Sequence, residues 1–527
     1  MIRQPDFLQT DNHVRWSWGQ GNQVWAMFAA AMAGDVSQVS SMLEADESLV
    51  RCSASYRTPL HFAVLYDRIE VVRLLLEKGA EVTYTGERGW HNSPVQLCRD
   101  RGYTELQTLL EQHQWANWQI CTAGDEIADA FRKRDVGLTE KLISKHGIEV
   151  ADARGNKPIH WAVMTRQVEL IDKLLGAGTD INSQRPDGAR PLDLTNGDYW
   201  YRGWRDLHPH APKDHIAIMD HLLNCGAFYD LTTACRRNDR NRVLEILADD
   251  PDAATRDADY STWYSGYPLR SAAKAGNIEL VRLLLDHGAD PNRAEHGLAP
   301  IGGCLYDAAQ NGHYEVVKFL LESGADPDQE VDSSGCVLFA ANDERTRSLL
   351  KGYGAVRDPF GCCYVGDAAD FAIQCERDAH AANDASLFGM AAERGYKDVV
   401  DIFLKYQPDM WSRKPAAIGK TPEITDWMLA SGMNINQTDW LGVHLLHRGC
   451  SAQVLEQFGQ LGVDLNLIDD EHLTTPLGGA ARRGDIEFVK LLLANGADPL
   501  VAGAAWARPV EWARRRNHLE IENLLIR

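Results

Sequence analysis

Aromatic, histidine and acidic side chains gather in the short segments that separate the predicted helices of this chain. The chain has 15 tryptophans and 16 tyrosines. Such rings stack on the apolar faces of a sugar or a peptide, while neighbouring carboxylates and imidazoles exchange hydrogen bonds with it. The residues expected to bind a ligand in this way are Trp90, His91, Trp200, Trp204, Trp263, Tyr264, His296, Trp440 and His472. The alternative for any one ring is that it fills an irregular contact between neighbouring units.

Five acidic residues in the same segments could do acid–base chemistry on a carbohydrate: Asp257, Asp259, Asp307, Asp469 and Glu471. A pair of carboxylates at a suitable separation acts as general acid and general base on a glycosidic bond. The sequence places no two of them at that separation, and aspartate is also the ordinary residue of a tight turn. Both interpretations stay open, and we expect binding rather than catalysis.

Histidines in one loop raise the question of a metal. His208 and His210 are two residues apart, which puts both rings on one side of an extended segment, and His215 follows. Proline-rich loops also hold histidines without a metal, and the chain has no paired Cys-x-x-Cys site and no phosphate-binding loop with lysine. We therefore expect neither a metal nor another cofactor.

The elements that must position these residues recur about every 33 residues. One unit reads Arg57-Thr58-Pro59-Leu60-His61-Phe62-Ala63 and ends, after an amphipathic run, at Gly79-Ala80. Thr58 can cap a helix whose first residue is Pro59, and Gly79 can end the second helix in a left-handed conformation. Between them, apolar residues at helical spacing over 69–76 form one stripe. The same frame returns at 157–162, 267–273, 475–481 and 508–513.

This pattern resembles the ankyrin-repeat family over nearly the whole chain. The resemblance implies an all-α solenoid of about 14–15 helix-turn-helix units with β-turn fingers and irregular insertions. His61 resembles the family histidine that forms hydrogen bonds between neighbouring turns. Fingers of this family project toward the concave face, so the aromatic and acidic finger residues would line one inner groove.

Irregular segments divide the chain. Insertions are expected at 196–210, which carries Trp200 and Trp204, at 294–303, and at 359–384, where a helix is expected within 366–382. The expected organisation is 1–54 N-terminal segment and capping repeat, 55–185 repeats, 186–230 repeat with the inserted aromatic loop, 231–358 repeats, 359–385 inserted helical segment, 386–500 repeats, and 501–527 C-terminal capping repeat. The aromatic segment 13–19 is expected to cap one open end, and the basic run 514–516 to be the solvated face of the other.

The overall composition excludes several classes of partner. The formal net charge is −21, which argues against nucleic acid and anionic membranes. No apolar run is long enough to span a bilayer, and the first residues lack the apolar core of a secretory signal. Eleven cysteines without regular spacing do not form a disulfide framework. We expect a cytoplasmic, monomeric protein.

The function expected is therefore binding: a concave, acidic and aromatic-rich groove presented to a protein or peptide partner. The alternative is a carbohydrate-binding or glycoside-processing protein that uses the same groove, with Asp257, Asp259, Asp469 or Glu471 as its acids. A purely structural spacer is the third possibility. One deep pocket would favour a small ligand, and a long shallow groove would favour a protein.

Overall fold

The computed structural model describes residues 2–12, 14, 17–82, 93–198, 200–256, 267–293, 303–329 and 336–526. Within these ranges the chain forms helices and turns, and β-type pairing is limited to isolated bridges. The expected all-α class is confirmed.

Helices follow one another in antiparallel pairs, each pair forming one unit. The pairs of the first part are α1 (Gly21–Ala33) with α2 (Val36–Ala45), α3 (Pro59–Leu65) with α4 (Ile69–Glu77), α5 (Pro94–Arg101) with α6 (Thr104–Trp118), α7 (Thr122–Lys133) with α8 (Val136–His146), α9 (Pro158–Met164) with α10 (Val168–Gly176), the 3-10 turn η3 (Pro191–Leu194) with α11 (His215–Asn224), and α12 (Leu231–Arg236) with α13 (Arg240–Asp249).

The pairs continue through the second part to the end of the chain. They are α14 (Pro268–Lys274) with α15 (Ile278–Asp286), α16 (Cys304–Gln310) with α17 (Tyr314–Glu322), α18 (Val337–Ala340) with α19 (Glu344–Gly352), α20 (Pro359–Val365) with α21 (Ala368–Arg377), α22 (Ala385–Glu393) with α23 (Lys397–Tyr406), α24 (Met410–Arg413) with α25 (Pro422–Ala430), α26 (Leu445–Arg448) with α27 (Ala452–Gln460), α28 (Pro476–Arg483) with α29 (Ile486–Ala494), and α30 (Pro509–Arg515) with α31 (Leu519–Ile526). Short 3-10 turns are η1 (Asp6–Leu8), η2 (Glu47–Arg51), η4 (Pro251–Thr255), η6 (Ala379–Ala382) and η7 (Ala505–Ala507).

Local sequence explains where each pair begins and ends. In the unit of α3 and α4, the Thr58 hydroxyl accepts a hydrogen bond from the His61 N–H, and Pro59 is the first helical residue. Gly79 ends the unit with φ at 85°, which is the left-handed conformation expected of it. The apolar stripe of α4 is buried, and it packs against neighbouring units because no unit can cover its own stripe.

Buried histidines link successive units. The His160 Nε2–H donates to the Ser183 carbonyl of the following finger at 2.9 Å, while its Nδ1 accepts from the Lys157 N–H at 3.0 Å. His447 does the same, donating to the Thr474 carbonyl at 3.2 Å. Each of these imidazoles is therefore a neutral connector with one donor and one acceptor in use.

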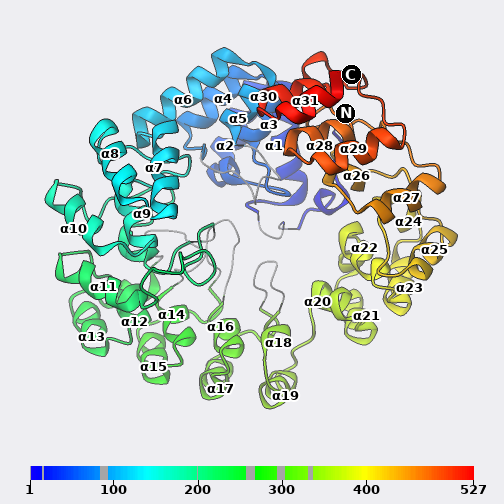
Figure 1. Cartoon of the computed structure of the whole chain (residues 1–527). Helices are drawn as coiled ribbons and strands as arrows, with labels where there is room; N and C mark the ends of the chain where they lie inside the picture. The colour runs from blue at the N-terminus through cyan, green and yellow to red at the C-terminus, as the bar shows by residue number, and fades with distance from the viewer. Residues whose placement is uncertain are drawn as a thin grey trace.

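The stack of units bends into a closed ring. The helices run once around a central space, and the two chain termini lie beside each other, with α30 and α31 next to α3 and α5 (Figure 1). Figure 1 also shows the segment 359–385, which contains α20 and α21, as part of the ring. The hydrophobic core that contains α1 to α6 also includes Leu441, which comes from the last quarter of the chain.

Closure corrects the expectation of two open, capped ends. The Arg514–Arg516 run is not a fully solvated face, because Arg516 forms an ion pair with Asp100 of α5 at 2.9 Å and Arg515 donates to the Asp100 carbonyl. Arg514 alone pairs within its own unit, with Glu511 and Glu522. The curvature of a solenoid accumulates over all its units, so local sequence signals do not show where its ends lie.

None of the helices in the described ranges combines the length and the apolar character needed to cross a bilayer.

Candidate functional site

The first insertion lies on the inner side of the ring, toward the central space (Figure 1), and lines a depression there. Its volume is about 600 Å³, and Arg132, Trp200, Tyr201, Arg205 and Asp206 line it. We call this depression the Trp200 hollow. Arg132 comes from α7, and the other four residues come from the inserted loop, so the insertion builds the site against the regular helices.

The buried Asp198 carboxylate gives the inserted loop its shape. It accepts hydrogen bonds from the backbone N–H groups of Trp200 at 2.9 Å and Tyr201 at 2.8 Å, and Arg185 pairs with it at 2.7 Å. Burial by itself would raise the pKa of Asp198, but the Arg185 guanidinium and the backbone N–H groups outweigh it and lower the pKa. Tyr201 then packs edge-on against Trp161 of α9, with ring centroids 5.4 Å apart.

Gly197→Ala should disrupt this loop. Gly197 has φ at 81°, and a Cβ there would collide with the Tyr201 carbonyl. We expect a loss of about 1–3 kcal/mol in unfolding free energy and a changed environment of Trp200, from strain and overpacking together. Chemical denaturation and tryptophan fluorescence measure both effects.

Gly178→Ala is the matched control, because Gly178 also has positive φ, 93°, but no atom lies near the position of its Cβ. It should share the backbone strain and leave the fluorescence of the hollow unchanged. Equal effects of the two substitutions on that fluorescence would show that Gly197 does not shape the hollow.

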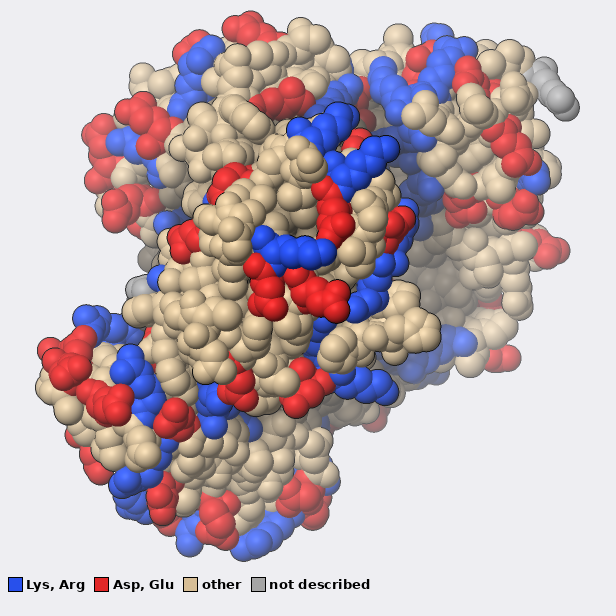
Figure 2. Space-filling view, turned by 60° about the vertical axis from the view of Figure 1, so that its left-hand side comes forward, with Lys and Arg blue, Asp and Glu red and all other residues tan. Residues whose placement is uncertain are grey.

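The hollow combines a ring with guanidinium groups. The Arg154 guanidinium lies 4.2 Å from the centroid of the Trp200 ring, and Trp204 nearby is 58% exposed. Two arginines and one aspartate line the hollow, and both arginines form ion pairs, Arg205 with Asp206 at 2.5 Å and Arg132 with Asp129 at 2.9 Å. The lining therefore carries both signs of charge, in contrast to the acidic groove expected from the sequence. Figure 2 shows basic side chains along the recess to the right of centre, whereas both signs are interspersed over the outer surface. Such a set can stack on a flat apolar group and bind a carboxylate beside it.

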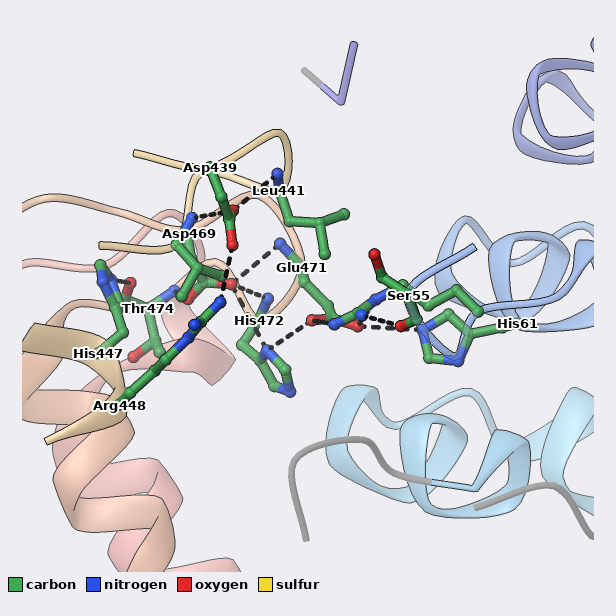
Figure 3. Close-up of polar contacts among 12 residues, drawn as sticks. Ser55, His61, Asp439, Leu441, His447, Arg448, Asp469, Glu471, His472 and Thr474 are labelled. Atoms are coloured by element: carbon green, nitrogen blue, oxygen red, sulfur yellow. Dashed lines mark hydrogen bonds and ion pairs between the residues drawn. The ribbon is translucent and has the colours of Figure 1, made fainter. Parts of the chain in front are cut away.

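A second cluster, the closure junction, joins the two ends of the ring. It consists of Arg57, His61, Phe62, Asp100 and Arg101 from α3, α5 and the loop before α3, with Trp440, Leu441, Glu471, Arg515 and Arg516 from the C-terminal units. Figure 3 shows Glu471 pointing from its finger toward Ser55 and His61. Its carboxylate accepts from Arg57 Nε at 2.9 Å, from Arg57 Nη2 at 2.6 Å and from His61 Nε2 at 3.1 Å. His61 thus bridges to a finger 410 residues farther along the chain.

The ion pair between Arg57 and Glu471 is buried. The Glu471 and Arg57 side chains are only 3% and 5% exposed. Burial would raise the pKa of Glu471, but the Arg57 charge and the His61 hydrogen bond hold that pKa well below its ordinary value. Burial also lowers the pKa of His61, so the imidazole is neutral and donates through Nε2–H.

Further aromatic, ionic and cation–π contacts link the N-terminal part of the chain to its C-terminal units. The Trp440 ring lies 6.3 Å from Phe7 and 6.2 Å from Phe62, between centroids. Arg413 pairs with Asp6 at 2.6 Å, and the Arg101 guanidinium lies 5.0 Å from the centroid of Trp506. Each contact joins one end of the chain to the other.

The residues predicted to bind a ligand fall into separate places. Trp200 lines the hollow and Trp204 lies beside it in the same loop. Trp440 belongs to the closure junction, and His472 lies beside it, with its Nδ1 3.8 Å from the Glu471 carboxylate and its ring 6.1 Å from the ring of Trp512. The remaining predicted residues, which lie outside the described ranges, are Trp90, His91, Trp263, Tyr264 and His296.

The acids considered for catalysis are engaged elsewhere or lie outside the described residues. The Asp469 carboxylate accepts from the backbone N–H groups of Glu471 and Thr474, and Asp307 pairs with Arg270 at 2.6 Å. Asp257 and Asp259 are not described. His208 and His210 have ring centroids 5.3 Å apart in the inserted loop.

Sequence reasoning missed Arg132, Tyr201, Arg205 and Asp206. The break in the repeat at 196–210 was the signal for the last three, since a long insertion in a compact array often carries function. Arg132 belongs to an ordinary repeat helix, and nothing in its sequence context separates it from a solvated arginine.

Comparisons with known proteins agree with the helical pairs. The model "Ankyrin repeats (3 copies)" matches residues 8–85 and 207–331, and the model "Ankyrin repeat" matches residues 472–504. The chain is 32% identical over 149 residues to the chicken (Gallus gallus) nuclear factor NF-kappa-B p105 subunit, covering 27% of this chain and 15% of that protein. It is 32% identical over 173 residues to human ankyrin repeat domain-containing protein 63, covering 32% of this chain and 35% of that protein.

These matches cover a minor part of the relatives, at most about a third of the length of the two proteins named. Among solved structures, the human ASB11 ankyrin repeat domain is 19% identical, with a TM-score of 0.25, and the match covers 43% of this chain and 96% of that one. Because the family models recognise both the N-terminal and the C-terminal units of the ring, the chain is a member of the ankyrin-repeat family.

Proposed function

We propose that this protein is a binding module whose ring holds a peptide segment of a partner protein, with the Trp200 hollow as its anchor. Ankyrin repeats generally serve as protein-interaction modules, which supports a protein-binding role. The observation that carries the finer proposal is the hollow itself, because it combines Trp200 with Arg132 and Arg205 on the inner side of the ring. Solenoids use their concave surfaces for binding.

The lining selects the chemistry of the peptide. An aromatic or apolar side chain would stack on Trp200, while a neighbouring carboxylate would compete with Asp129 for Arg132 or with Asp206 for Arg205. Tryptophan and arginine are the residues that most often dominate binding energy at interfaces. We therefore propose a segment with an apolar residue beside an acidic one.

Trp200→Ala tests this proposal. The full chain is screened against a displayed peptide library, and the affinity of the best segment is measured by calorimetry for the wild type and the variant. We expect a loss of at least about 2 kcal/mol, close to 30-fold in Kd, as for an interface anchor.

Trp115→Ala is the matched control, since Trp115 lies on α6 and is 51% exposed but does not line the hollow. It should leave the affinity unchanged. Equal affinities for Trp200→Ala and wild type would rule out the hollow as the anchor.

A carbohydrate remains the alternative ligand, favoured by the same pairing of a ring with the Asp206 carboxylate. A thermal-shift screen of the full chain against oligosaccharides separates the two ligands. A shift abolished by Trp200→Ala would favour the carbohydrate, and a flat panel would favour the peptide. We further propose that the protein acts as a cytoplasmic monomer, which its eleven unpaired cysteines support.

A further inference from the structure

Three metal-ligating side chains meet on the outer rim of the ring, away from the Trp200 hollow. They are Asp172 of α10, His221 of α11 and Cys225 directly after α11. The two helices lie side by side at the rim (Figure 1). One carboxylate oxygen, one imidazole nitrogen and the thiol sulfur all lie within 4.8 Å of one another. His221 Nε2 is 2.6 Å from the Asp172 carboxylate and 4.0 Å from the Cys225 sulfur.

The local fold places these groups together without strain. His221 and Cys225 are four residues apart on a helix that extends through its C-cap, so both side chains share one face. The site lies at the C-terminal turn of α11, where the partial negative charge of the helix dipole favours a cation. Lys173, next to Asp172, pairs with Glu140 on α8.

The donor set identifies the class of metal. Thiolate, imidazole and carboxylate together suit Zn²⁺, with bonds of about 2.0–2.3 Å. Such bonds set the donor atoms of a tetrahedral site roughly 3.2–3.8 Å apart, so the observed 2.6 Å and 4.0 Å separations need adjustments of under about 1 Å. All eleven cysteines lie in the described ranges, and Cys225 is the one classed as exposed. A metal ion in solution can therefore reach its sulfur.

We propose that Asp172, His221 and Cys225 form a zinc-binding site with water in the fourth position. On binding, the Cys225 thiol releases its proton to solvent, and the neutral imidazole carries its remaining proton on Nδ1, which leaves the Nε2 lone pair for the metal. The Asp172 carboxylate exchanges its contact with His221 for the metal. Three protein ligands and one open position are the arrangement of an accessible rather than a closed structural site.

Cobalt titration of the chelator-treated full chain is the test. Co²⁺ takes the same ligands as Zn²⁺, and a thiolate ligand gives a charge-transfer band in the near ultraviolet. We expect one equivalent of Co²⁺ to produce this band and Zn²⁺ to abolish it. Cys225→Ser should remove the band, and His221→Ala should weaken binding more than about 100-fold, beyond the 10–100-fold loss that outer-shell changes cause.

Cys450→Ser controls for the cysteine substitution, because Cys450 is partly exposed and belongs to a distant unit; the band should persist in this variant. Circular dichroism checks that each variant stays folded, which the exposure of Asp172 and Cys225 favours. No band with wild type, or a band retained in Cys225→Ser, would overturn the proposal. Binding that survives Cys225→Ser but is lost in His208→Ala with His210→Ala would place the metal in the inserted loop instead, and would equally overturn it.

Discussion

Glu471→Gln should open the ring. The substitution keeps the shape of the side chain but removes the carboxylate that pairs with the Arg57 guanidinium, which is 5% exposed. Removing one partner of a buried ion pair costs about 3–5 kcal/mol. Because the pair joins units at opposite ends of the chain, this loss falls on closure rather than on any one unit. We expect a larger radius of gyration in X-ray scattering and faster hydrogen exchange in α3, α5 and the finger that carries Glu471, with exchange in α14–α17 unchanged.

Two variants make this prediction specific. Glu487→Gln removes a carboxylate that is 81% exposed and pairs with Lys490 on the same helix, so it should change stability by less than about 1 kcal/mol. Arg57→Met combined with Glu471→Leu replaces both charges by apolar groups and should restore most of the closure. A Glu471→Gln ring with unchanged scattering and unchanged exchange at α3 would show that the ion pair does not hold the ends together.

Mild acid should destabilise the whole array. Burial lowers the pKa of His160 from 6.5 to about 3, with the Arg185 charge acting in the same direction. The unfolded chain binds a proton at this histidine below pH 6.5, whereas the folded protein does not, so stability present above pH 6.5 is lost as the pH falls toward 3. The slope is about 1.4 kcal/mol per pH unit, or about 2 kcal/mol between pH 6.5 and pH 5. His447 and His61 also have lowered pKa values and act with the same sign.

The hydrogen bonds of His160 explain why the folded protein does not bind this proton. The Nδ1 atom accepts a hydrogen bond from the Lys157 N–H, so a proton on Nδ1 would point at another N–H group. Urea denaturation at pH 7.5, 6.0 and 5.0 measures the slope. His160→Gln should be less stable at pH 7.5 but show a slope lower by about 1.4 kcal/mol per pH unit. His210→Gln, at an exposed loop position, should leave the slope unchanged. A wild-type stability that is constant from pH 7.5 to pH 5 would contradict this account.

The units themselves could be predicted from the sequence because each is specified locally. Thr58, Pro59 and Gly79 fix the ends of a helical pair within one period, and the apolar stripe between them fixes which face is buried. The family resemblance also gave His61 the right kind of role. It could not give the partner Glu471, because that residue lies 410 residues farther along the chain.

Closure of the ring could not be predicted from the sequence for the same reason. Glu471 and Arg57 are 414 residues apart, and an acidic residue in a finger looks like ordinary turn chemistry. In the sequence, Arg515 and Arg516 look like part of a solvated basic run, whereas in the structure both contact Asp100. The Trp200 hollow could be predicted in part. Its insertion was visible as a break in the period, but Arg132 joins it only through the stacking of a separate unit.

A closed ring constrains how such a protein can change its size. An open array can gain or lose a unit at either end for the energy of one interface, since each unit contacts only its neighbours. Here the rotations of all the units together must equal one full turn for Glu471 to reach Arg57. Repeat proteins usually lengthen by duplication of a single unit. Here a duplication would move the finger that carries Glu471 beyond the position where it contacts Arg57. The number of units is therefore fixed by geometry. During evolution, the loops of this protein can change far more easily than the number of its repeats.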